Sequence, residues 1–356
     1  MFRFRLLTFL TLSRFIKILN IISDCNLRSV PRAPLELGGA FDMNNPRVSV
    51  VIPCFNVAET VSETIASVTA QTMADFEIIA VDNRCTDNTI DVLSKISISE
   101  PRLRIIKESV QGPSAARNGG IRAARGEFIA LLDADDLWDA EYLEKHLANL
   151  VDEQVGISYA RVRMIDMESQ PTGPVTRPHL NDLTASDLLR SNPCTALLVV
   201  RAQVFEDVGF FDEDLRSAED QEWLFRAAHR GVKLSGIDQV LASYRITPGG
   251  LTANLDAMLD SHGKLLNAAA RIAPDVVAGN RRLASAAMLR YCARRSVEHG
   301  KSNDVARRYL VQMLKTAPEL LLREPLSTLK VIARVLWPTM RLPKSRPVQV
   351  MQVGET

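Results

Sequence analysis

Four short apolar segments between residues 47 and 132 constrain the fold of this chain more than any other feature. They are rich in β-branched residues and have the length of buried strands: Arg47–Ile52, Phe76–Val81, Leu103–Ile106 and Phe128–Leu132. Between them the sequence predicts helices over Ala58–Thr69, from Asp87 or Asn88 onward, and from Gly112 to Ala124. Strands that alternate with helices at this pace predict an α/β fold, with a mostly parallel, Rossmann-like sheet flanked by helices.

The pattern becomes less regular beyond residue 151. Further strands are predicted over 157–160, 197–200 and 240–245, a helix over 220–231, and a surface loop over 166–183. From about residue 256 the chain is predicted to be helical, with Ala284–Arg295 and Asn303–Leu314 as an antiparallel pair. We therefore expect an N-terminal extension over 1–45, an α/β domain over 46–255 and a helical C-terminal region over 256–356.

The composition argues against several classes of protein. The formal net charge over 356 residues is +1, so the chain has no global field that would attract nucleic acid, and no nucleic-acid partner is expected. The five cysteines are scattered without metal-ligand spacing, which is typical of free thiols in a reducing compartment. No two of the five histidines have ligand spacing on one helix face, so a histidine-based zinc site is not expected.

An acidic cluster follows the fourth apolar segment directly. Asp133, Asp135 and Asp136 come within four residues, at the predicted carboxyl end of a buried strand. Ligands of open α/β sheets bind at that edge. Carboxylates this close repel one another unless a cation joins them, and Mg²⁺ or Mn²⁺ prefers oxygen ligands and also holds phosphates. The cluster therefore predicts a divalent metal site beside a phosphate group, rather than a solvated loop that caps the helix near Glu141.

Both ends of the chain are basic and apolar. Residues 1–23 contain four cations and no acid, but no uninterrupted apolar stretch long enough to span a bilayer. We expect this segment either to lie on an anionic membrane surface as an amphipathic helix or to precede a natural start at Met43. No clear cleavage site supports secretion. Near the other end, apolar residues recur at helical spacing beside basic ones; they are Leu326, Leu329, Ala333 and Leu336. This pattern predicts either a packed helix with a solvated face or a second basic membrane contact.

Four polar segments share the edge where the predicted strands end or a later helix begins. They are Pro53–Asn56, Asp82–Asp87, Asp133–Asp136 and Ser217–Asp220. Together with Arg117-Asn118-Gly119 and Tyr244-Arg245, their order and spacing over residues 46–255 resemble the inverting glycosyltransferases of family 2. These enzymes use nucleotide-sugar donors on a GT-A fold. The resemblance therefore implies a GT-A glycosyltransferase.

The resemblance assigns a donor site to the first half of the domain. Pro53 and Asn56 match the nucleotide-facing loop, and Asp82 matches the acid that binds the base or ribose. Arg84 stands where the family commonly has glycine. Arg117 is expected to contact phosphate or to support the acidic loop.

The acidic cluster matches the DxD motif of the family. Asp135 is expected to ligate Mn²⁺ or Mg²⁺ directly, with Asp136 as the second metal-site residue. Asp133, like Asp136, is expected to bind the donor sugar or ribose or to ligate the metal through water.

The catalytic base falls in the second half. Asp220, in the Glu-Asp pair before a helix, matches the base that takes the proton of the acceptor hydroxyl. Inverting displacement requires such a base, as it does in inverting glycoside hydrolases. Glu219 is expected to hold the acceptor or orient the base, and Arg245 to contact the diphosphate.

The resemblance thus implies transfer of a sugar from a UDP-, GDP- or dTDP-sugar to a saccharide or lipid-linked acceptor in surface polysaccharide assembly. We expect a cytoplasmic protein, peripheral on the inner face of the plasma membrane. One alternative is a polyprenyl-phosphate sugar transferase of the same fold. A sugar-1-phosphate nucleotidyltransferase is less favoured, because it would need a glycine-rich loop with Arg and Lys after the first strand, where Pro53–Asn56 stands. A processive synthase and a non-catalytic binding module are both disfavoured.

Overall fold

The computed structural model describes residues 45–173, 175–176, 180, 183–192, 197–215, 217–247, 254–298 and 303–336. The predicted N-terminal extension, up to residue 44, lies outside the described residues, as do the basic residues beyond 336. No helix within the described ranges is both long and apolar enough to cross a membrane.

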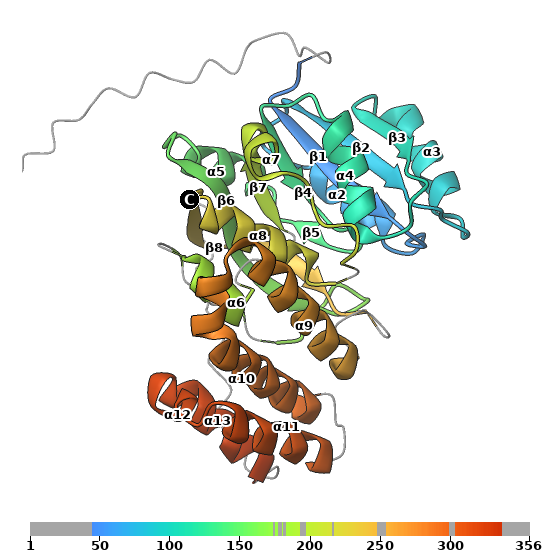
Figure 1. Cartoon of the computed structure of the whole chain (residues 1–356). Helices are drawn as coiled ribbons and strands as arrows, with labels where there is room; N and C mark the ends of the chain where they lie inside the picture. The colour runs from blue at the N-terminus through green and yellow to red at the C-terminus, as the bar shows by residue number, and fades with distance from the viewer. Residues whose placement is uncertain are drawn as a thin grey trace, which may run out of the picture. The chain divides into compact units, whose positions relative to one another are not determined.

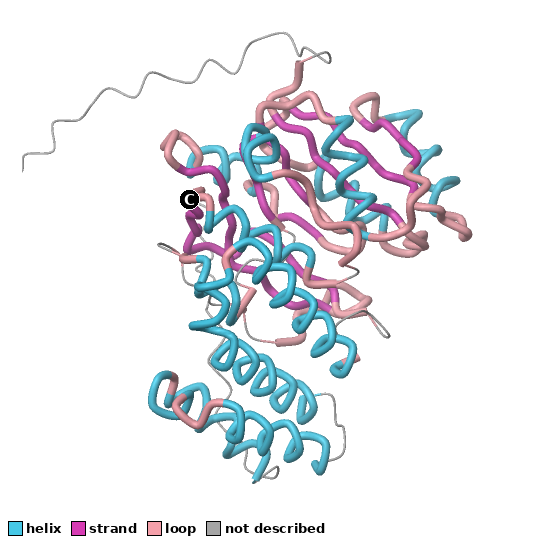
Figure 2. Tube along the Cα trace, viewed as in Figure 1, coloured by secondary structure: helices cyan, strands magenta, loops and turns pink. Residues whose placement is uncertain are grey.

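Eight strands of the described residues form one sheet in the order β3-β2-β1-β4-β7-β6-β8-β5 (Figure 1). Their bounds are β1 Val48–Cys54, β2 Phe76–Asp82, β3 Leu103–Lys107, β4 Phe128–Leu131, β5 Leu137–Trp138, β6 Val155–Ile165, β7 Leu198–Arg201 and β8 Lys233–Arg245. Figure 2 shows these strands in magenta among the cyan helices. Strands β3, β2, β1 and β4 are parallel, while β7 runs antiparallel to both β4 and β6. The four strands expected in the first part of the domain are all present, and the α/β fold class is confirmed.

The helices cover both faces of the sheet and continue beyond it. Their bounds are α2 Val61–Thr69, α3 Thr89–Ser99, α4 Pro113–Ala123, α5 Tyr142–Asn149, α6 Ala185–Arg190, α7 Ala202–Val208, α8 Glu219–His229, α9 Leu255–Ile272, α10 Pro274–Glu298, α11 Asn303–Thr316, α12 Leu320–Arg323 and α13 Pro325–Leu336.

The alternation of side chains along β1 shows why the central strands are apolar throughout. Val50 and Ile52 enter a core on one face with residues of α2, α3 and α5, whereas Val51 enters the core on the other face with residues of α4 and α8. All three side chains are completely buried. A parallel sheet covered on both faces requires apolar residues at consecutive positions, and the continuous apolar segments of the sequence reflect this.

The second half of the sheet differs from the expectation in the length of its strands and in the antiparallel direction of β7 and β5. The sequence predicted strands over 157–160 and 240–245, but β6 and β8 are both much longer. They pair in parallel with register shifts near Ala160 and Arg161, and exposed polar residues such as Asp238 interrupt the apolar pattern. Bulges of this kind hide a strand from a pattern search, because the period of two is lost.

The C-terminal region is helical, as expected. Helices α11, α12 and α13 gather around α10 (Figure 1), with Leu289, Cys292, Tyr309 and Met313 in a core of their own. Helix α9 contributes to both cores, because Leu255 joins the core of the C-terminal helices and Leu265 joins the core beneath the sheet. The boundary placed after residue 255 therefore crosses a continuous packing region, and it stays a prediction.

Candidate functional site

The loops that follow β1 and β2 are tied together at the carboxyl edge of the sheet. The side-chain oxygen of Asn56 accepts hydrogen bonds from the backbone N–H groups of Thr86 at 2.8 Å and Asp87 at 3.3 Å. The carboxylate of Asp87 in turn accepts one from the N–H of Ala58 at 3.1 Å. Asn56, expected to face the nucleotide, thus also shapes the loop, and Pro53 lies just before it at the end of β1.

Asp82 ends β2 with one carboxylate oxygen committed to the protein. Its Oδ1 accepts a hydrogen bond from the N–H of Cys85 at 2.9 Å. Arg84, between them, has φ of +67°. This left-handed conformation costs a non-glycine residue about 1–2 kcal/mol. The turn therefore has the backbone that glycine would adopt, although the chain places arginine there.

An exposed aromatic ring lies in the loop after β1. Phe55 is 47% exposed, which is unusual for phenylalanine at the end of a buried strand. The sequence reasoning did not single it out, although an aromatic residue next to Asn56 at a ligand-binding edge was the signal available.

The acidic cluster after β4 is arranged in two layers. Asp133 and Asp135 are partly exposed, whereas Asp136 is only 1% exposed. The Oδ1 atom of Asp136 accepts a hydrogen bond from the N–H of Arg245 at 2.8 Å, and its backbone carbonyl accepts one from the Thr64 hydroxyl at 2.9 Å. Asp136 therefore holds the loop from below, and Asp133 and Asp135 face outward.

Arg245 lies beneath this loop with its guanidinium fully buried. It donates to the backbone carbonyl of Asp135 at 2.7 Å, to the carbonyl of Asp166 at 2.9 Å and to the Glu63 carboxylate at 2.7 Å. Every nitrogen of the guanidinium has a protein acceptor, so Arg245 supports the acidic loop in this conformation. The diphosphate contact expected for it would require these bonds to be exchanged.

The anionic forms of Asp135 and Asp136 are disfavoured in this loop. Burial, followed by the charge of Asp133, raises the pKa of Asp135 to about 6. Burial, followed by Asp135 and Asp133, also raises the pKa of Asp136 well above its usual value. In addition, the buried Oδ2 of Asp136 has no hydrogen-bond partner among the described residues. A nearby cation would relieve this repulsion.

A divalent metal is compatible with these residues but would need additional ligands. Among the described residues, no group of three His, Cys, Asp or Glu side chains is placed to hold a metal alone. The carboxylates fit Mg²⁺ or Mn²⁺, which commonly take substrate phosphate oxygens as further ligands.

Arg117 joins the acidic loop to a second acidic pair. Its side chain is 5% exposed and donates to the carboxylates of Asp133 and Glu219, both at 2.6 Å. Burial acts to lower the pKa of Arg117, but the charges of Asp133 and Glu219 raise it above its ordinary value. The guanidinium is therefore a permanent cation that balances one acid of each group. Its contact with Asp133 ties Arg117 to the loop after β4, and its role in the site stays a prediction.

The second acidic pair begins helix α8. Ala218 precedes it with φ of +63°, so the chain turns sharply before Glu219 and Asp220. The Oδ2 atom of Asp220 accepts a hydrogen bond from the Asn192 amide at 2.7 Å. Its Oδ1 accepts one from the N–H of Gln221 at 2.8 Å. Burial raises the pKa of Asp220, although Arg117 and Asn192 oppose the effect. A carboxylate with a raised pKa is a stronger base.

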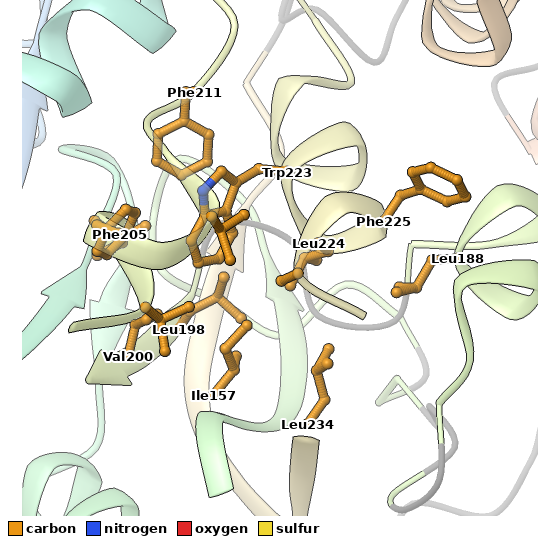
Figure 3. Close-up of a cluster of buried hydrophobic side chains, with 14 of the residues drawn as sticks. Ile157, Leu188, Leu198, Val200, Phe205, Phe211, Trp223, Leu224, Phe225 and Leu234 are labelled. Atoms are coloured by element: carbon orange, nitrogen blue, oxygen red, sulfur yellow. The ribbon is translucent and has the colours of Figure 1, made fainter. Parts of the chain in front are cut away.

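Helix α8 is fixed by aromatic packing one turn beyond the acids (Figure 3). The ring of Trp223 stacks on Phe205 with centroids 4.6 Å apart and contacts Phe211 at 5.4 Å. Its indole N–H donates to the carbonyl of Gly209 at 2.7 Å. This completely buried anchor sets the position of α8, and hence of Asp220 at its start.

Comparison with known proteins agrees with this geometry. The sequence model described as Glycosyl transferase family 2 matches residues 49–209. Glycosyltransferase AglE of Haloferax volcanii is 30% identical over 58% of this chain and 69% of its own length. The chain belongs to glycosyltransferase family 2. The resemblance seen in its motifs is thereby confirmed.

Other family 2 relatives cover different shares of their own lengths. A UDP-Glc:alpha-D-GlcNAc-diphosphoundecaprenol beta-1,3-glucosyltransferase of Escherichia coli is 27% identical over 60% of this chain and 82% of its own. By contrast, the chain spans 46% of an uncharacterized glycosyltransferase of Rickettsia conorii, at 28% identity over 77% of this chain.

A solved structure shares the fold of this family 2 chain. It is a mannosyltransferase of Pyrobaculum calidifontis in complex with GDP-Man and Mn²⁺, with a TM-score of 0.53 and 19% identity. The match covers 85% of this chain and 90% of that one. The GT-A fold is therefore confirmed, including part of the helical region that follows it.

The family 2 site also includes residues that the motifs did not reveal. Asn192 reaches Asp220 from 28 positions away, and Glu63 reaches Arg245 from 182 positions away. No spacing in the sequence signals either contact, because both arise from folding.

Proposed function

We propose that this chain transfers a sugar, with inversion, from a nucleotide-sugar donor to a hydroxyl group of a saccharide or glycolipid. The observation that carries the proposal is the pairing of two acidic groups by one buried arginine. Arg117 contacts Asp133 of the loop after β4 and Glu219 at the start of α8. One group is suited to a donor with its metal, and the other supplies a base with a raised pKa.

The donor nucleotide would occupy the loops after β1 and β2. The carboxylate of Asp82, which ends β2, can accept a hydrogen bond from a ribose hydroxyl or a base N–H. The exposed ring of Phe55 offers a surface on which a base can stack, an interaction worth about 1–3 kcal/mol. One relative uses UDP-Glc, and one structural neighbour binds GDP-Man. The donor nucleotide of this chain could therefore contain either uridine or guanosine.

Asp135 is the proposed metal ligand, with Asp133 beside it for the donor sugar or a metal-bound water. Asp136 is too deeply buried to reach a solvent-exposed ion in this conformation, so we give it a positioning role. Bound Mn²⁺ or Mg²⁺ would neutralise the charge that develops on the departing diphosphate. The raised pKa of Asp135 fits this role, because a neighbouring cation would favour its ionised form.

Asp220 is the proposed general base. Its carboxylate would take the proton of the acceptor hydroxyl while that oxygen forms the new bond to the anomeric carbon. The bond from that carbon to the diphosphate breaks on the opposite side, so one displacement inverts the configuration. Asn192 keeps one Asp220 oxygen oriented, and Arg117 fixes Glu219 next to it.

A hydroxyl acceptor is favoured over a polyprenyl phosphate. A phosphate oxygen is already ionised and would not require the base that Asp220 supplies. The acceptor of the Escherichia coli relative is a sugar carried on a lipid diphosphate. A similar acceptor would place this enzyme at the inner face of a membrane, in polysaccharide assembly.

The test is a donor screen with the purified chain. We expect Mn²⁺-dependent release of nucleoside diphosphate from one UDP-, GDP- or dTDP-sugar, and loss of that release in a chelator. Asp135→Ala should reduce nucleoside diphosphate affinity in Mn²⁺ to the metal-free value, because the ion loses its protein ligand. Asp139→Ala, close by but facing Arg163, is the matched control and should keep its metal response. Full turnover of Asp135→Ala would refute the metal assignment.

A further inference from the structure

An exposed apolar stripe runs along α12 and α13. Four of the eleven most exposed large apolar side chains of the described residues lie between positions 322 and 336. Leu322 is 85% exposed, Leu326 75%, Leu329 54% and Leu336 45%. Positions 326, 329 and 336 fall on one helix face by the 3.6-residue period.

The opposite face of α13 is already occupied. Thr328, Val331 and Val335 are buried, the two valines in the core that α13 shares with α10 and α11. The segment predicted as a packed helix is therefore helix α13, but only one of its two apolar faces is packed. A soluble surface rarely leaves several leucines in a row without a partner.

Cations accompany the stripe. Arg323 and Lys330 are exposed, and no described carboxylate pairs with either of them. The neighbouring acids are already paired: Glu319 lies 3.3 Å from Arg282, Glu324 bonds Arg290, and Glu298 bonds Arg294. The sequence beyond residue 336 adds three more cations and a single acid. Electrostatically this surface is suited to an anionic partner.

We propose that the face formed by Leu322, Leu326, Leu329, Arg323 and Lys330 docks on an anionic lipid surface. Helices that combine exposed leucines with cations at their flank bind the boundary between headgroups and acyl chains. Pairing with a second copy of the same stripe is disfavoured, because two-fold symmetry would bring Arg323 and Lys330 of each copy toward those of the other. The inference does not depend on the catalytic assignments above.

Vesicle co-sedimentation of the full chain, without donor or acceptor, tests the proposal. The vesicles contain phosphatidylcholine either alone or mixed with phosphatidylglycerol. The double variant Leu326→Gln/Leu329→Gln should bind the anionic vesicles at least ~10-fold more weakly, because two apolar side chains no longer enter the lipid. Lys330→Glu should lose ~5-fold or more on the anionic vesicles only.

Helix α3 supplies matched controls. Ile98 is 87% exposed and Lys95 is an exposed lysine of the same helix. Ile98→Gln replaces one exposed aliphatic side chain by glutamine away from the stripe, and Lys95→Glu makes the same charge reversal as Lys330→Glu. Both should bind like the unaltered chain. Circular dichroism melting should show that all variants fold.

Three results would overturn the proposal. The first is equal vesicle binding by the α13 and α3 variants, which would place any lipid contact elsewhere, for example in residues 1–23. The second is the absence of vesicle binding by the unaltered chain. The third is a change of oligomeric state in Leu326→Gln/Leu329→Gln without vesicles, measured by light scattering, which would make the stripe a contact between copies.

Discussion

The proposed chemistry depends most directly on the carboxylate of Asp220. Asp220→Asn keeps the shape and most of the hydrogen bonding but cannot accept a proton near neutral pH. Positioned bases contribute on the order of 10²- to 10⁴-fold, so turnover should fall by about that factor. Affinity for nucleoside diphosphate, measured by calorimetry, should hardly change, because Asp82 and the acidic loop remain.

The exposed acid Asp214 provides the control, since Asp214→Asn makes the same change away from the site. Near-normal turnover of Asp220→Asn would exclude Asp220 as the base. Parallel losses of turnover and nucleotide affinity would move Asp220 into the donor site and leave Glu219 as the candidate.

We expect Asn192 to lower the pKa of the proposed base, Asp220. Burial raises the pKa of Asp220, and the Asn192 amide acts to lower it by bonding the ionised form. Because the base works deprotonated, kcat/KM should be lost as pH falls through the pKa of Asp220. Asn192→Ala removes the amide, so the acidic limb of the pH profile should move to higher pH. A limb that stays in place while kcat/KM drops at every pH would assign Asn192 a purely structural role.

At the scale of single elements, the packing of Trp223 stabilises the position of α8. Trp223→Ala removes a completely buried ring that stacks on Phe205. Substitutions of this type lower the free energy of unfolding by about 3–5 kcal/mol. Urea denaturation measures the loss. Phe210→Ala, a nearby ring that is 39% exposed, should cost far less, and equal costs would contradict the anchoring role.

The same scale shows what sequence can and cannot predict. The strands β1, β2, β3 and β4 were evident because burial on both faces makes each an apolar run. Asp82, Asp133 and Asp135 were evident because they end or follow such strands, whereas Asp220 was evident only from the resemblance to the family. Strand β5, with two residues, carries no pattern of its own. Asn192, Glu63 and Phe55 acquire their places through tertiary contacts or exposure, which no local spacing encodes.

At the scale of the whole molecule, the first strand among the described residues begins at Val48, and the described site lies between Pro53 and Arg245. Deletion of residues 1–42 should therefore leave metal-dependent donor turnover unchanged in detergent-free buffer. Weaker vesicle binding by the truncated chain would make residues 1–23 a second lipid contact, whereas unchanged binding would exclude that role. Failure of the truncated chain to fold would show that the domain boundary lies earlier.

The two ion pairs of Arg117, with Asp133 and Glu219, limit which chimeras of such enzymes can fold. Asp133 follows Arg117 by only 16 positions, but Glu219 follows 102 positions after the arginine. A chimera with its crossover between 133 and 219 would inherit the cation from one parent and its distant counter-ion from the other. Acceptor preference could then be exchanged between relatives only where both parents carry an acid at this position. Otherwise the hybrid would contain a buried charge without its partner, and its yield of folded protein should fall before its specificity can be measured.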